Sequence, residues 1–448
     1  MKQEFDVLII GAGISGAALF HQLSKYTNIK NIALIEKYNA PASLNSKSTS
    51  NSQTIHCGDI ETNYTLEKAK KVKVSADMII KYGLLQNAQN KFMFSHQKMV
   101  LGVGDIECDF IKNRYEEFKE LYPYIKLFDK DKIKNIEPKV ALDSDGINTR
   151  KENILAIGVE KNEIFTTVDF EKMSYSLIEQ AQKQNKNTSV IYNQEIVHIE
   201  KKDDIFVVKS SDFKEYRAKF VVVNAGAHSL YLAHKMNLGL DKSCWPVAGS
   251  FYLTKKRLLN GKVYTVQNPK LPFAALHGDP DLMADMNTRF GPTALVIPKL
   301  ERYKGLKSVP EFFEALKFDK TVLRVCIKML KDPTIRNYIF YNYLFEIPFI
   351  NKKIFVKDIR KIIPSLRVDD IYYAKGFGGI RPQVVDKTKE ELMLGESSIN
   401  DIPGIIFNMT PSPGATSCLY NAQKDTKIIC EYLGTSINED RLNSELLN

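Results

Sequence analysis

The chain has few cysteines and lacks long hydrophobic runs, and both features exclude whole classes of protein. Its 448 residues include six cysteines, which lie far apart and form no Cys-x-x-Cys pair. This spacing is not that of a disulfide framework or a zinc site, so we expect isolated thiols and no bound metal. No segment reaches the roughly 18 to 20 consecutive apolar residues that a membrane-spanning helix requires. Because the chain opens directly on a predicted strand, we also expect no cleavable signal and a cytoplasmic protein.

Negative charge is scarce in one region. The whole chain carries a formal charge of +10, and residues 299–361 hold 15 Lys and Arg against 7 Asp and Glu. Such a concentration favours contact with an anionic surface, either lipid or nucleic acid.

Two stretches of this basic region are also apolar. Residues 319–332 carry apolar side chains at helical spacing, and residues 334–350 are rich in Tyr and Phe. The spaced side chains are Val322, Val325, Cys326, Met329 and Leu330. An apolar stripe beside basic residues is typical of a helix in the headgroup region of a bilayer, although it is also typical of a core helix. The aromatic residues cluster with aliphatic ones and do not alternate with basic ones, so we predict membrane contact through residues 310–350 and no nucleic-acid partner.

A dinucleotide-binding pattern occupies the start of the chain. Apolar residues 7–10 lead into the segment Gly11-Ala12-Gly13-Ile14-Ser15-Gly16, and a helix is predicted over residues 17–25. In G-x-G-x-x-G the first glycine permits a tight turn, the second lets the backbone approach a pyrophosphate, and the third lets the helix pack on the strand. A second predicted strand, 32–35, ends in Glu36 at the usual distance for a carboxylate that binds a ribose hydroxyl. The pattern predicts a Rossmann-type unit that binds FAD.

The remaining segments predict a nucleotide-binding domain that is discontinuous in sequence. A polar stretch over residues 42–65 has no periodicity, and loops of this length are usually functional. Strands are predicted at 216–224 and 405–408, and a helix is predicted from residue 415 to about residue 433. The expected fold class is therefore α/β, with a mixed-sheet α+β substrate domain. We assign residues 1–90, 151–235 and 371–448 to the FAD-binding domain, and residues 91–150 and 236–370 to the substrate domain.

Candidate chemistry lies in a turn, an arginine and two histidines. The turn at 410–417 is expected to present backbone amides at a helix start, and such amides favour the electron-rich edge of a reduced flavin. An ordinary helix N-terminus without a ligand has the same sequence pattern. Arg381 lies in a Gly-rich, apolar setting, where a guanidinium can grip a substrate carboxylate or form a structural salt bridge. His56 and His277 are candidates for the base that takes a hydroxyl proton during hydride transfer, and both also suit a structural role.

Five further segments resemble a known family. They are Asn51-Ser52-Gln53-Thr54-Ile55-His56, Glu61-Thr62-Asn63-Tyr64-Thr65, Pro246-Val247-Ala248-Gly249, Gly379-Ile380-Arg381-Pro382-Gln383 and Thr410-Pro411-Ser412-Pro413-Gly414-Ala415. With the glycine motif, they resemble FAD-dependent malate:quinone oxidoreductases of epsilon-type bacteria. That family is similar to the wider D-amino-acid oxidase and glycine oxidase group, so the resemblance implies the same two-domain fold.

The resemblance also implies an activity. (S)-malate would be oxidised to oxaloacetate by hydride transfer to FAD, and the electrons would pass to a membrane quinone, menaquinone or ubiquinone. L-2-hydroxyglutarate or another 2-hydroxy acid is the alternative substrate. In such a site Arg381 grips the substrate carboxylate and Gln383 lies beside it. We expect His277 to take the proton and His56 to line the flavin or the substrate, with the order of the two histidines left open.

The expected FAD contacts come from several segments of the chain. They are Gly11, Gly13, Ile14, Ser15, Gly16, Glu36, Lys37, Gln53, Thr54, Val197, Ala225, Gly226, Arg381, Pro413, Gly414, Ala415 and Thr416. A protein that reduces a membrane quinone without a membrane-spanning helix must reach the bilayer from its surface. We therefore expect peripheral attachment to the cytoplasmic membrane.

Overall fold

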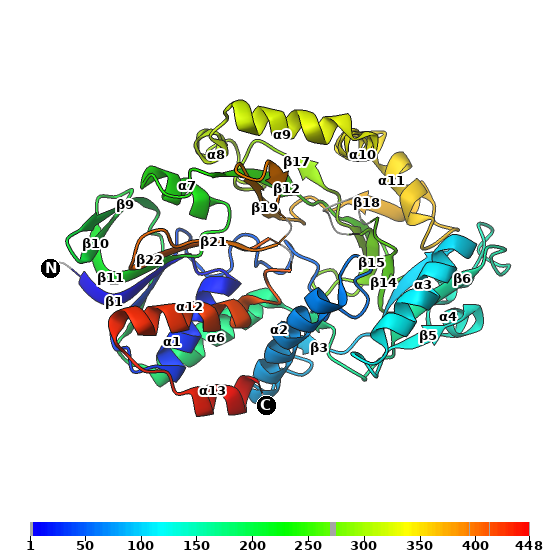
Figure 1. Cartoon of the computed structure of the whole chain (residues 1–448). Helices are drawn as coiled ribbons and strands as arrows, with labels where there is room; N and C mark the ends of the chain where they lie inside the picture. Colours follow the sequence, from blue (N-terminus) through cyan, green and yellow to red (C-terminus); the bar gives the residue numbers. More distant parts are fainter. Residues whose placement is uncertain (1–2, 269–274, 394, 412, 448) are drawn as a thin grey trace.

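Two large sheets organise the chain in the computed structural model, which describes residues 3–268, 275–393, 395–411 and 413–447. Figure 1 shows the first sheet at the left, with helices beneath it, and the second sheet at the right. A smaller sheet of four strands, in the order β17-β12-β19-β20, lies between them. Its strands are β12 (Lys242–Ala248), β17 (Leu295–Val296), β19 (Ile380–Asp386) and β20 (Glu391–Leu392).

The first sheet is the predicted nucleotide-binding sheet. Its strands run in the order β21-β22-β11-β1-β2-β8, and β10 and β9 extend it beside β11. The pairs β1·β2, β1·β11 and β11·β22 are parallel, so predicted strands from both ends of the chain lie side by side. The bounds are β1 (Gln3–Ile10), β2 (Ile32–Ile35), β8 (Thr188–Ile191), β9 (Ile196–Lys202), β10 (Ile205–Ser210), β11 (Glu215–Val223), β21 (Ser397–Ile399) and β22 (Ile405–Met409). This arrangement confirms the predicted Rossmann-type unit.

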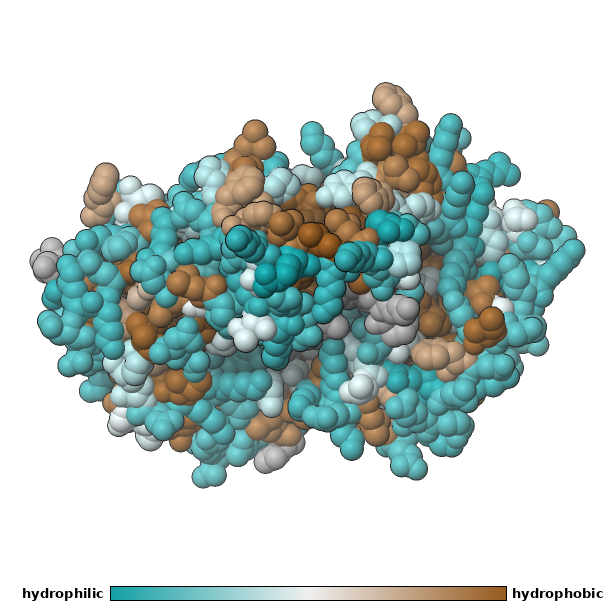
Figure 2. Space-filling view, turned by 45° about the horizontal axis from the view of Figure 1, so that its top comes forward, coloured by the Kyte–Doolittle hydropathy of each residue, from teal (hydrophilic) through white to brown (hydrophobic). Residues whose placement is uncertain are grey.

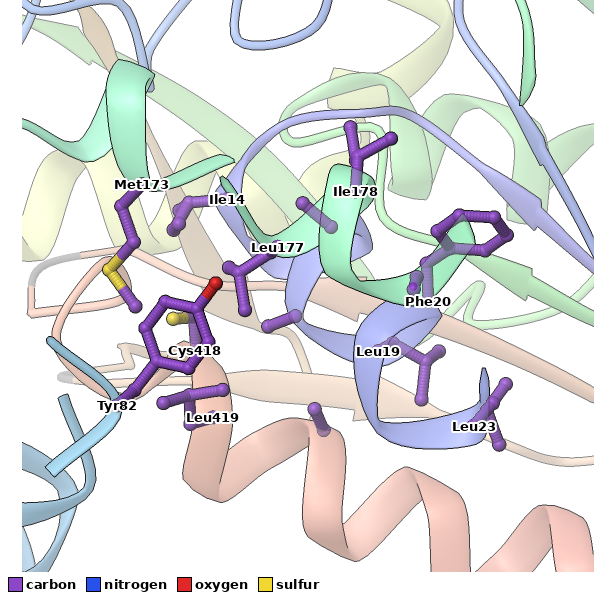
Figure 3. Packing of buried hydrophobic residues seen from close by; sticks show 14 of the residues in the cluster. Ile14, Leu19, Phe20, Leu23, Tyr82, Met173, Leu177, Ile178, Cys418 and Leu419 are labelled. Carbon is purple, nitrogen blue, oxygen red and sulfur yellow. The ribbon is translucent and has the colours of Figure 1, made fainter. Parts of the chain in front are cut away.

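Alternate side chains of this sheet enter two different cores. Val7 and Ile9 face α1 (Ile14–Tyr26), α6 (Phe170–Gln184) and α12 (Cys418–Leu433), whereas Leu8 and Ile10 face α7 (His228–Lys235). Figure 3 shows side chains of α1, α6 and α12 packed together, with Tyr82 of α2 (Leu66–Leu85) beside them. Each large apolar side chain buried here stabilises the fold by about 1.5–3 kcal/mol. The C-terminal α13 (Glu439–Leu446) closes the same core.

The second sheet forms the other half of the molecule. Its strands run in the order β18-β13-β16-β15-β14-β4-β6-β5. Their bounds are β4 (Lys98–Val103), β5 (Lys126–Phe128), β6 (Ile154–Val159), β13 (Tyr252–Thr254), β14 (Lys262–Thr265), β15 (His277–Pro280), β16 (Thr288–Gly291) and β18 (Ile371–Tyr373). Both β6 and β18 pair within this sheet, so the sheet boundaries lie beyond the predicted divisions at residues 151 and 371.

Helices cover the second sheet, and a small ribbon accompanies it. The helices are α3 (Asp105–Phe118), α4 (Lys130–Ile136), α5 (Pro138–Ala141) and α11 (Asn351–Ile359), with the short η1 (Val368–Asp370). The ribbon pairs β3 (Met93–Phe94) with β7 (Thr167–Val168). Helix α2 contributes Ala76 to the core of the first sheet and Ala69 to that of the second, so it joins the two halves.

The basic region contains α8 (Val309–Leu316), α9 (Lys320–Lys331) and α10 (Pro333–Leu344), which lie on one side of the molecule, and ends with α11 (Figure 1). The predicted stripe on α9 divides between core and surface. Val322 and Val325 are buried, whereas Leu330 is exposed together with Leu323 and Ile327. None of the helices among the described residues is long and apolar enough to cross a membrane.

Candidate active site

A cleft runs from the N-terminal glycine turn to the start of β19. Its walls come from the β1–α1 turn, the end of β2, the polar 42–65 loop, β9, the turn after β11, β19 and the 410–415 turn. The predicted site residues on these walls are Gly11, Gly13, Ile14, Ser15, Glu36, Lys37, Thr54, His56, Val197, Ala225, Gly226, Arg381, Pro413, Gly414 and Ala415. The fold therefore brings together segments that are as far apart in the sequence as Gly11 and Ala415.

The glycine turn has the close backbone contacts that its motif predicts. Gly11 has φ +100°, and a Cβ there would lie 2.5 Å from the Asn224 carbonyl oxygen. A Cβ at Gly16 would lie 1.9 Å from the Gly11 carbonyl oxygen, so Gly16 supports the turn without lining the cleft. The Glu36 carboxylate accepts hydrogen bonds from the amides of Ala12 (2.7 Å) and Tyr38 (3.0 Å). These contacts leave a narrow, glycine-lined cradle at the start of α1, which fits a dinucleotide pyrophosphate.

A hydroxyl from the polar loop also reaches this cradle. The Ile14 amide, in the first turn of α1, donates to Ser46 Oγ at 2.9 Å. Sequence reasoning marked the 42–65 loop as functional but did not single out Ser46, because no spacing rule links this serine to the glycine motif. The loop therefore closes over the end of the cleft where the helix dipole favours an anion.

Charged side chains gather at the nucleotide end of the cleft. Lys37 Nζ lies 2.8 Å from Glu301 and 3.0 Å from Glu195, and the Tyr38 hydroxyl donates to Glu301 at 2.7 Å. Burial lowers the pKa of Lys37, and the two carboxylates raise it by more, so the net shift is upward. The segment around Glu301 is thereby fastened to the first sheet.

The C-terminal turn differs from its prediction. Helix α12 begins at Cys418, three residues later than expected. The amides of Gly414, Thr416 and Ser417 donate to carbonyl groups inside the turn, so the expected row of unpaired amides is wrong for these residues. Pro413, Gly414 and Ala415 line the cleft, whereas Thr416 lies behind it and its Oγ1 accepts the His56 amide at 3.1 Å. Helix signals could not locate this boundary because the turn imitates a first helical turn.

Arg381 is held in place through its neighbours in the backbone. It is the second residue of β19. Gly378 before it has φ +118°, and a Cβ there would lie 1.9 Å from the Gly249 carbonyl oxygen. The Ile380 amide donates to Asn45 Oδ1 of the polar loop at 2.9 Å. These close contacts place the arginine against the loop that carries His56.

The guanidinium of Arg381 is half-buried on the cleft wall, without an acid beside it. In the part of the chain that the structure describes, it forms no ion pair and no hydrogen bond. Burial lowers the pKa of Arg381, while the phenols of Tyr338, Tyr64 and Tyr264 act in the opposite direction. A half-buried guanidinium on a cleft wall has donors free for a ligand and forms its strongest hydrogen bonds with an anion, so this site suits a carboxylate. The structural salt bridge left open by the sequence is absent among the described residues.

His56 forms a dyad with Glu61. Its Nδ1 lies 2.8 Å from Glu61 Oε1, and His56 lines the cleft. Burial raises the pKa of Glu61, and the hydrogen bond and charge of His56 lower it by more, so the carboxylate stays ionised. An anionic Glu61 accepts the Nδ1 proton, which leaves Nε2 of His56 as the acceptor nitrogen. Arg114 donates to the carbonyl oxygens of Glu61 (3.1 Å) and Tyr64, and so fixes this loop.

His277 lies behind the cleft wall. Its ring stacks on Tyr264 at 4.4 Å, and the Tyr264 hydroxyl shares a 2.9 Å hydrogen bond with Thr54 Oγ1 on the wall. Nδ1 donates to the Ala275 carbonyl at 3.1 Å, and Nε2 has no partner among the described residues. Burial lowers the pKa of His277 to about 3.

Two further predicted residues also lie off the wall. The Gln383 amide donates to the Met393 carbonyl, so it faces β20. The buried Gln53 side chain bonds the Ser48 carbonyl at 2.9 Å and the Leu282 amide at 3.2 Å. Both side chains therefore hold other parts of the protein in the described structure.

Solved structures share this fold across nearly the whole chain. L-α-glycerophosphate oxidase from Mycoplasma pneumoniae, a structure with FAD bound, matches with a TM-score of 0.63 and 19% identity over 97% of this chain and 96% of that one. Glycine oxidase from Geobacillus kaustophilus matches with a TM-score of 0.63 and 13% identity over 96% and 95%. The fold and the cleft thus define the structural class of the protein, which is the fold shared by FAD-dependent oxidases.

Sequence comparison identifies the family within this class. The family model Malate:quinone oxidoreductase (Mqo) matches residues 3–424. A probable malate:quinone oxidoreductase of Campylobacter jejuni is 78% identical over 100% of both chains, and the malate:quinone oxidoreductase of Helicobacter pylori is 51% identical over 100% of this chain and 98% of that one. The chain belongs to the malate:quinone oxidoreductase family, which confirms the resemblance seen in its motifs.

Proposed function

We propose that the protein is an FAD-dependent enzyme that oxidises (S)-malate to oxaloacetate and passes the electrons to a membrane quinone. Family membership across residues 3–424 supports this activity. The structural observation that carries it is the half-buried guanidinium of Arg381, which lines the cleft and lacks an acidic partner among the described residues. A 2-hydroxy acid supplies the carboxylate that such a group requires.

Different residues of the cleft carry out different steps of the proposed reaction. Arg381 binds a substrate carboxylate and so orients the carbon that carries the hydroxyl. FAD, when bound, supplies the hydride acceptor. His56 Nε2 takes the hydroxyl proton as the hydride leaves the carbon, and Glu61 stabilises the imidazolium that forms. We assign this role to His56 in preference to His277, because His56 lines the cleft and has a carboxylate partner.

We assign the dinucleotide to the glycine end of the cleft. Gly11 and Gly13 receive the pyrophosphate, and Glu36 lies where a ribose hydroxyl binds in folds of this type. The 413–415 turn lies toward the flavin ring. Gly16, Gln53 and Thr416 act from behind the wall. Gly16 packs against Gly11, the Gln53 amide donates to Asn51 Oδ1, and Thr416 Oγ1 accepts the His56 amide.

An anaerobic titration of the purified protein tests cofactor, reaction and substrate together. Malate should bleach the oxidised flavin absorbance at lower concentration than L-2-hydroxyglutarate or lactate, and the malate-reduced protein should reduce a soluble quinone analogue. Faster bleaching by L-2-hydroxyglutarate would assign that substrate instead. Colourless protein that takes up no FAD would refute the proposal.

We further propose that the helices α8 to α10 dock on the anionic cytoplasmic membrane. Figure 2 shows apolar side chains gathered on the face that carries these helices in Figure 1. Exposed apolar residues there include Phe313 (58%), Phe318 (59%), Leu323, Ile327, Leu330, Phe340 (60%) and Phe349 (91%). Residues 309–344 hold six Lys and Arg against four Asp and Glu, and the flanking residues of 299–361 hold the rest of the charge excess. Attraction to anionic lipid would therefore add to apolar insertion.

Vesicle flotation tests the docking surface. The protein should bind vesicles that contain anionic lipid and lose most binding in the double variant Leu323→Ser/Ile327→Ser. Phe213→Ser is a matched control, because Phe213 is 95% exposed but lies in the turn between β10 and β11. If both variants bind equally, or if neutral vesicles bind as well as anionic ones, the proposed surface is wrong.

A further inference from the structure

Four charged side chains are buried together behind the loop that leads to His56. They are Lys262 of β14, Asp279 of β15, Arg289 of β16, and Asp281, with side chains at most 1% exposed. Arg289 contacts Asp279 at 2.8 Å and Asp281 at 2.5 Å, and Lys262 contacts Asp279 at 3.0 Å. None of the four lines the cleft in the described structure.

The two cations of this cluster also grip the backbone of the loop. Arg289 donates to the carbonyl oxygens of Asn51 (3.1 Å) and Ser52 (3.0 Å), and Lys262 Nζ lies 3.3 Å from the Ser52 carbonyl. Asn51 and Ser52 line the cleft. The chain reaches the catalytic candidate His56 four residues after Ser52.

The loop is unusual at the same point. Gln53 follows the two gripped carbonyls and has φ +52°, a region that non-glycine residues rarely adopt. Such a conformation persists when surrounding contacts determine it, and the buried cluster supplies those contacts on one side. The Gln53 side chain supplies more, through the Leu282 amide and the Ser48 carbonyl.

Stability does not account for the cluster. Replacing buried ion pairs by apolar side chains of similar volume is often neutral or stabilising, because charges lose their hydration when buried. The charged groups instead provide hydrogen-bond donors in a fixed geometry, since the planar guanidinium points its N–H groups at two adjacent carbonyl groups. We therefore expect the cluster to control the conformation of the loop at residues 51–52.

We propose that Arg289, held by Asp279 and Asp281 and assisted by Lys262, is a positioning residue for His56. The cluster fixes residues 51–52 and thereby the place of the imidazole on the cleft wall. This inference rests on the proposed role of His56 as the base. Substrate binding depends on Arg381, on a different segment, so the cluster acts on the rate of the reaction and not on affinity for malate.

The first experiment replaces Arg289 by lysine in the FAD-loaded enzyme. Lysine keeps the charge between the two aspartates but loses the planar guanidinium, so kcat for flavin reduction by malate should fall about 10- to 100-fold with KM nearly unchanged. Arg150→Lys is the matched control, because Arg150 is also buried and donates to two carbonyl groups, those of Val140 (3.3 Å) and Lys361 (3.2 Å), away from the cleft. Equal kcat losses in the two variants, or a rise in KM alone, would overturn the proposal.

A double-mutant cycle separates positioning from general damage. If Arg289 acts through His56, Arg289→Lys should change the residual rate of the His56→Ala enzyme less than twofold. Independent, multiplicative losses would overturn the positioning role while leaving the proposed base intact. A His56→Ala enzyme with normal rates would instead refute both.

A milder variant covers the case in which Arg289→Lys does not fold. Lys262→Met removes one of the three contacts to the 51–52 carbonyls and keeps Arg289 paired with both aspartates. Its kcat should fall about three- to tenfold, and the fall should again vanish in the His56→Ala background. A folded, FAD-loaded Lys262→Met enzyme with wild-type kcat would count against the cluster.

Discussion

Replacing Arg381 by methionine removes the proposed carboxylate grip and keeps the volume of the side chain. The guanidinium is half-buried on the cleft wall and forms no ion pair or hydrogen bond among the described residues, so its donors remain available for a ligand. Two charge-assisted hydrogen bonds at about 1.5 kcal/mol each contribute about 3 kcal/mol of transition-state binding. This corresponds to a loss of about 150-fold in kcat/KM for malate.

The same substitution should not weaken the folded protein. Removal of Arg381 breaks no ion pair among the described residues. Because an unpaired cation that is shielded from water opposes folding, Tm without substrate should stay constant or rise. Arg150→Met should behave in the opposite way. It removes a structural arginine, so Tm should fall while kcat/KM stays within about twofold.

Anaerobic stopped-flow reduction of the flavin by malate gives the rate, and differential scanning fluorimetry gives Tm. Arg381→Lys should fall between wild type and Arg381→Met, because lysine keeps the charge but not the parallel donors. Normal kcat/KM in Arg381→Met would refute the proposed substrate site. A large fall in Tm would show that Arg381 is structural after all.

Three further predictions follow from single contacts. Glu61→Gln removes the carboxylate that accepts the His56 Nδ1 proton, so kcat in stopped-flow assays should fall about a hundredfold. His21 is buried with its pKa lowered to about 3, so only the unfolded chain gains its proton between pH 6.5 and 3. The unfolding free energy should therefore be complete above pH 6.5 and fall toward pH 3, by up to about 1.4 kcal/mol per pH unit, and urea titrations of His21→Leu should give a shallower slope. Gly378→Ala places a Cβ 1.9 Å from the Gly249 carbonyl oxygen, so Tm and malate turnover should both drop in fluorimetry and activity assays.

Each of these predictions has a control and a contradicting result. Glu67→Gln alters an exposed pair on α2 and should leave kcat unchanged, so equal losses in both variants would exclude the dyad. A slope in His21→Leu as steep as in wild type would mean that this histidine does not titrate on unfolding. Gly376→Ala is the comparison for Gly378→Ala, since both glycines have positive φ but a Cβ at Gly376 meets nothing within 4 Å. Equal effects of the two would attribute the loss to backbone conformation and not to the close contact.

Features that depend only on residues close together in the chain could be predicted from the sequence. The glycine turn, the strands at 7–10 and 32–35 and the acidic Glu36 follow from local spacing, because one strand, turn and helix create them. The family follows from longer motifs, since residues 3–424 match its model. The extent of α12 and the orientation of the apolar side chains on α9 were less readable, because packing decides them.

The sequence by itself determined the dinucleotide-binding unit and the family, and it marked Arg381 and His56 as candidate site residues. Tertiary structure alone decided which groups stand beside them. It leaves Arg381 without an acid among the described residues, pairs His56 with Glu61, and places His277 behind Tyr264. His56 and Glu61 lie in one loop without regular structure, so their spacing carries no helix or strand signal. The surroundings of Arg381 and His277 join distant segments, which meet only when the second sheet packs against the loop that closes the first.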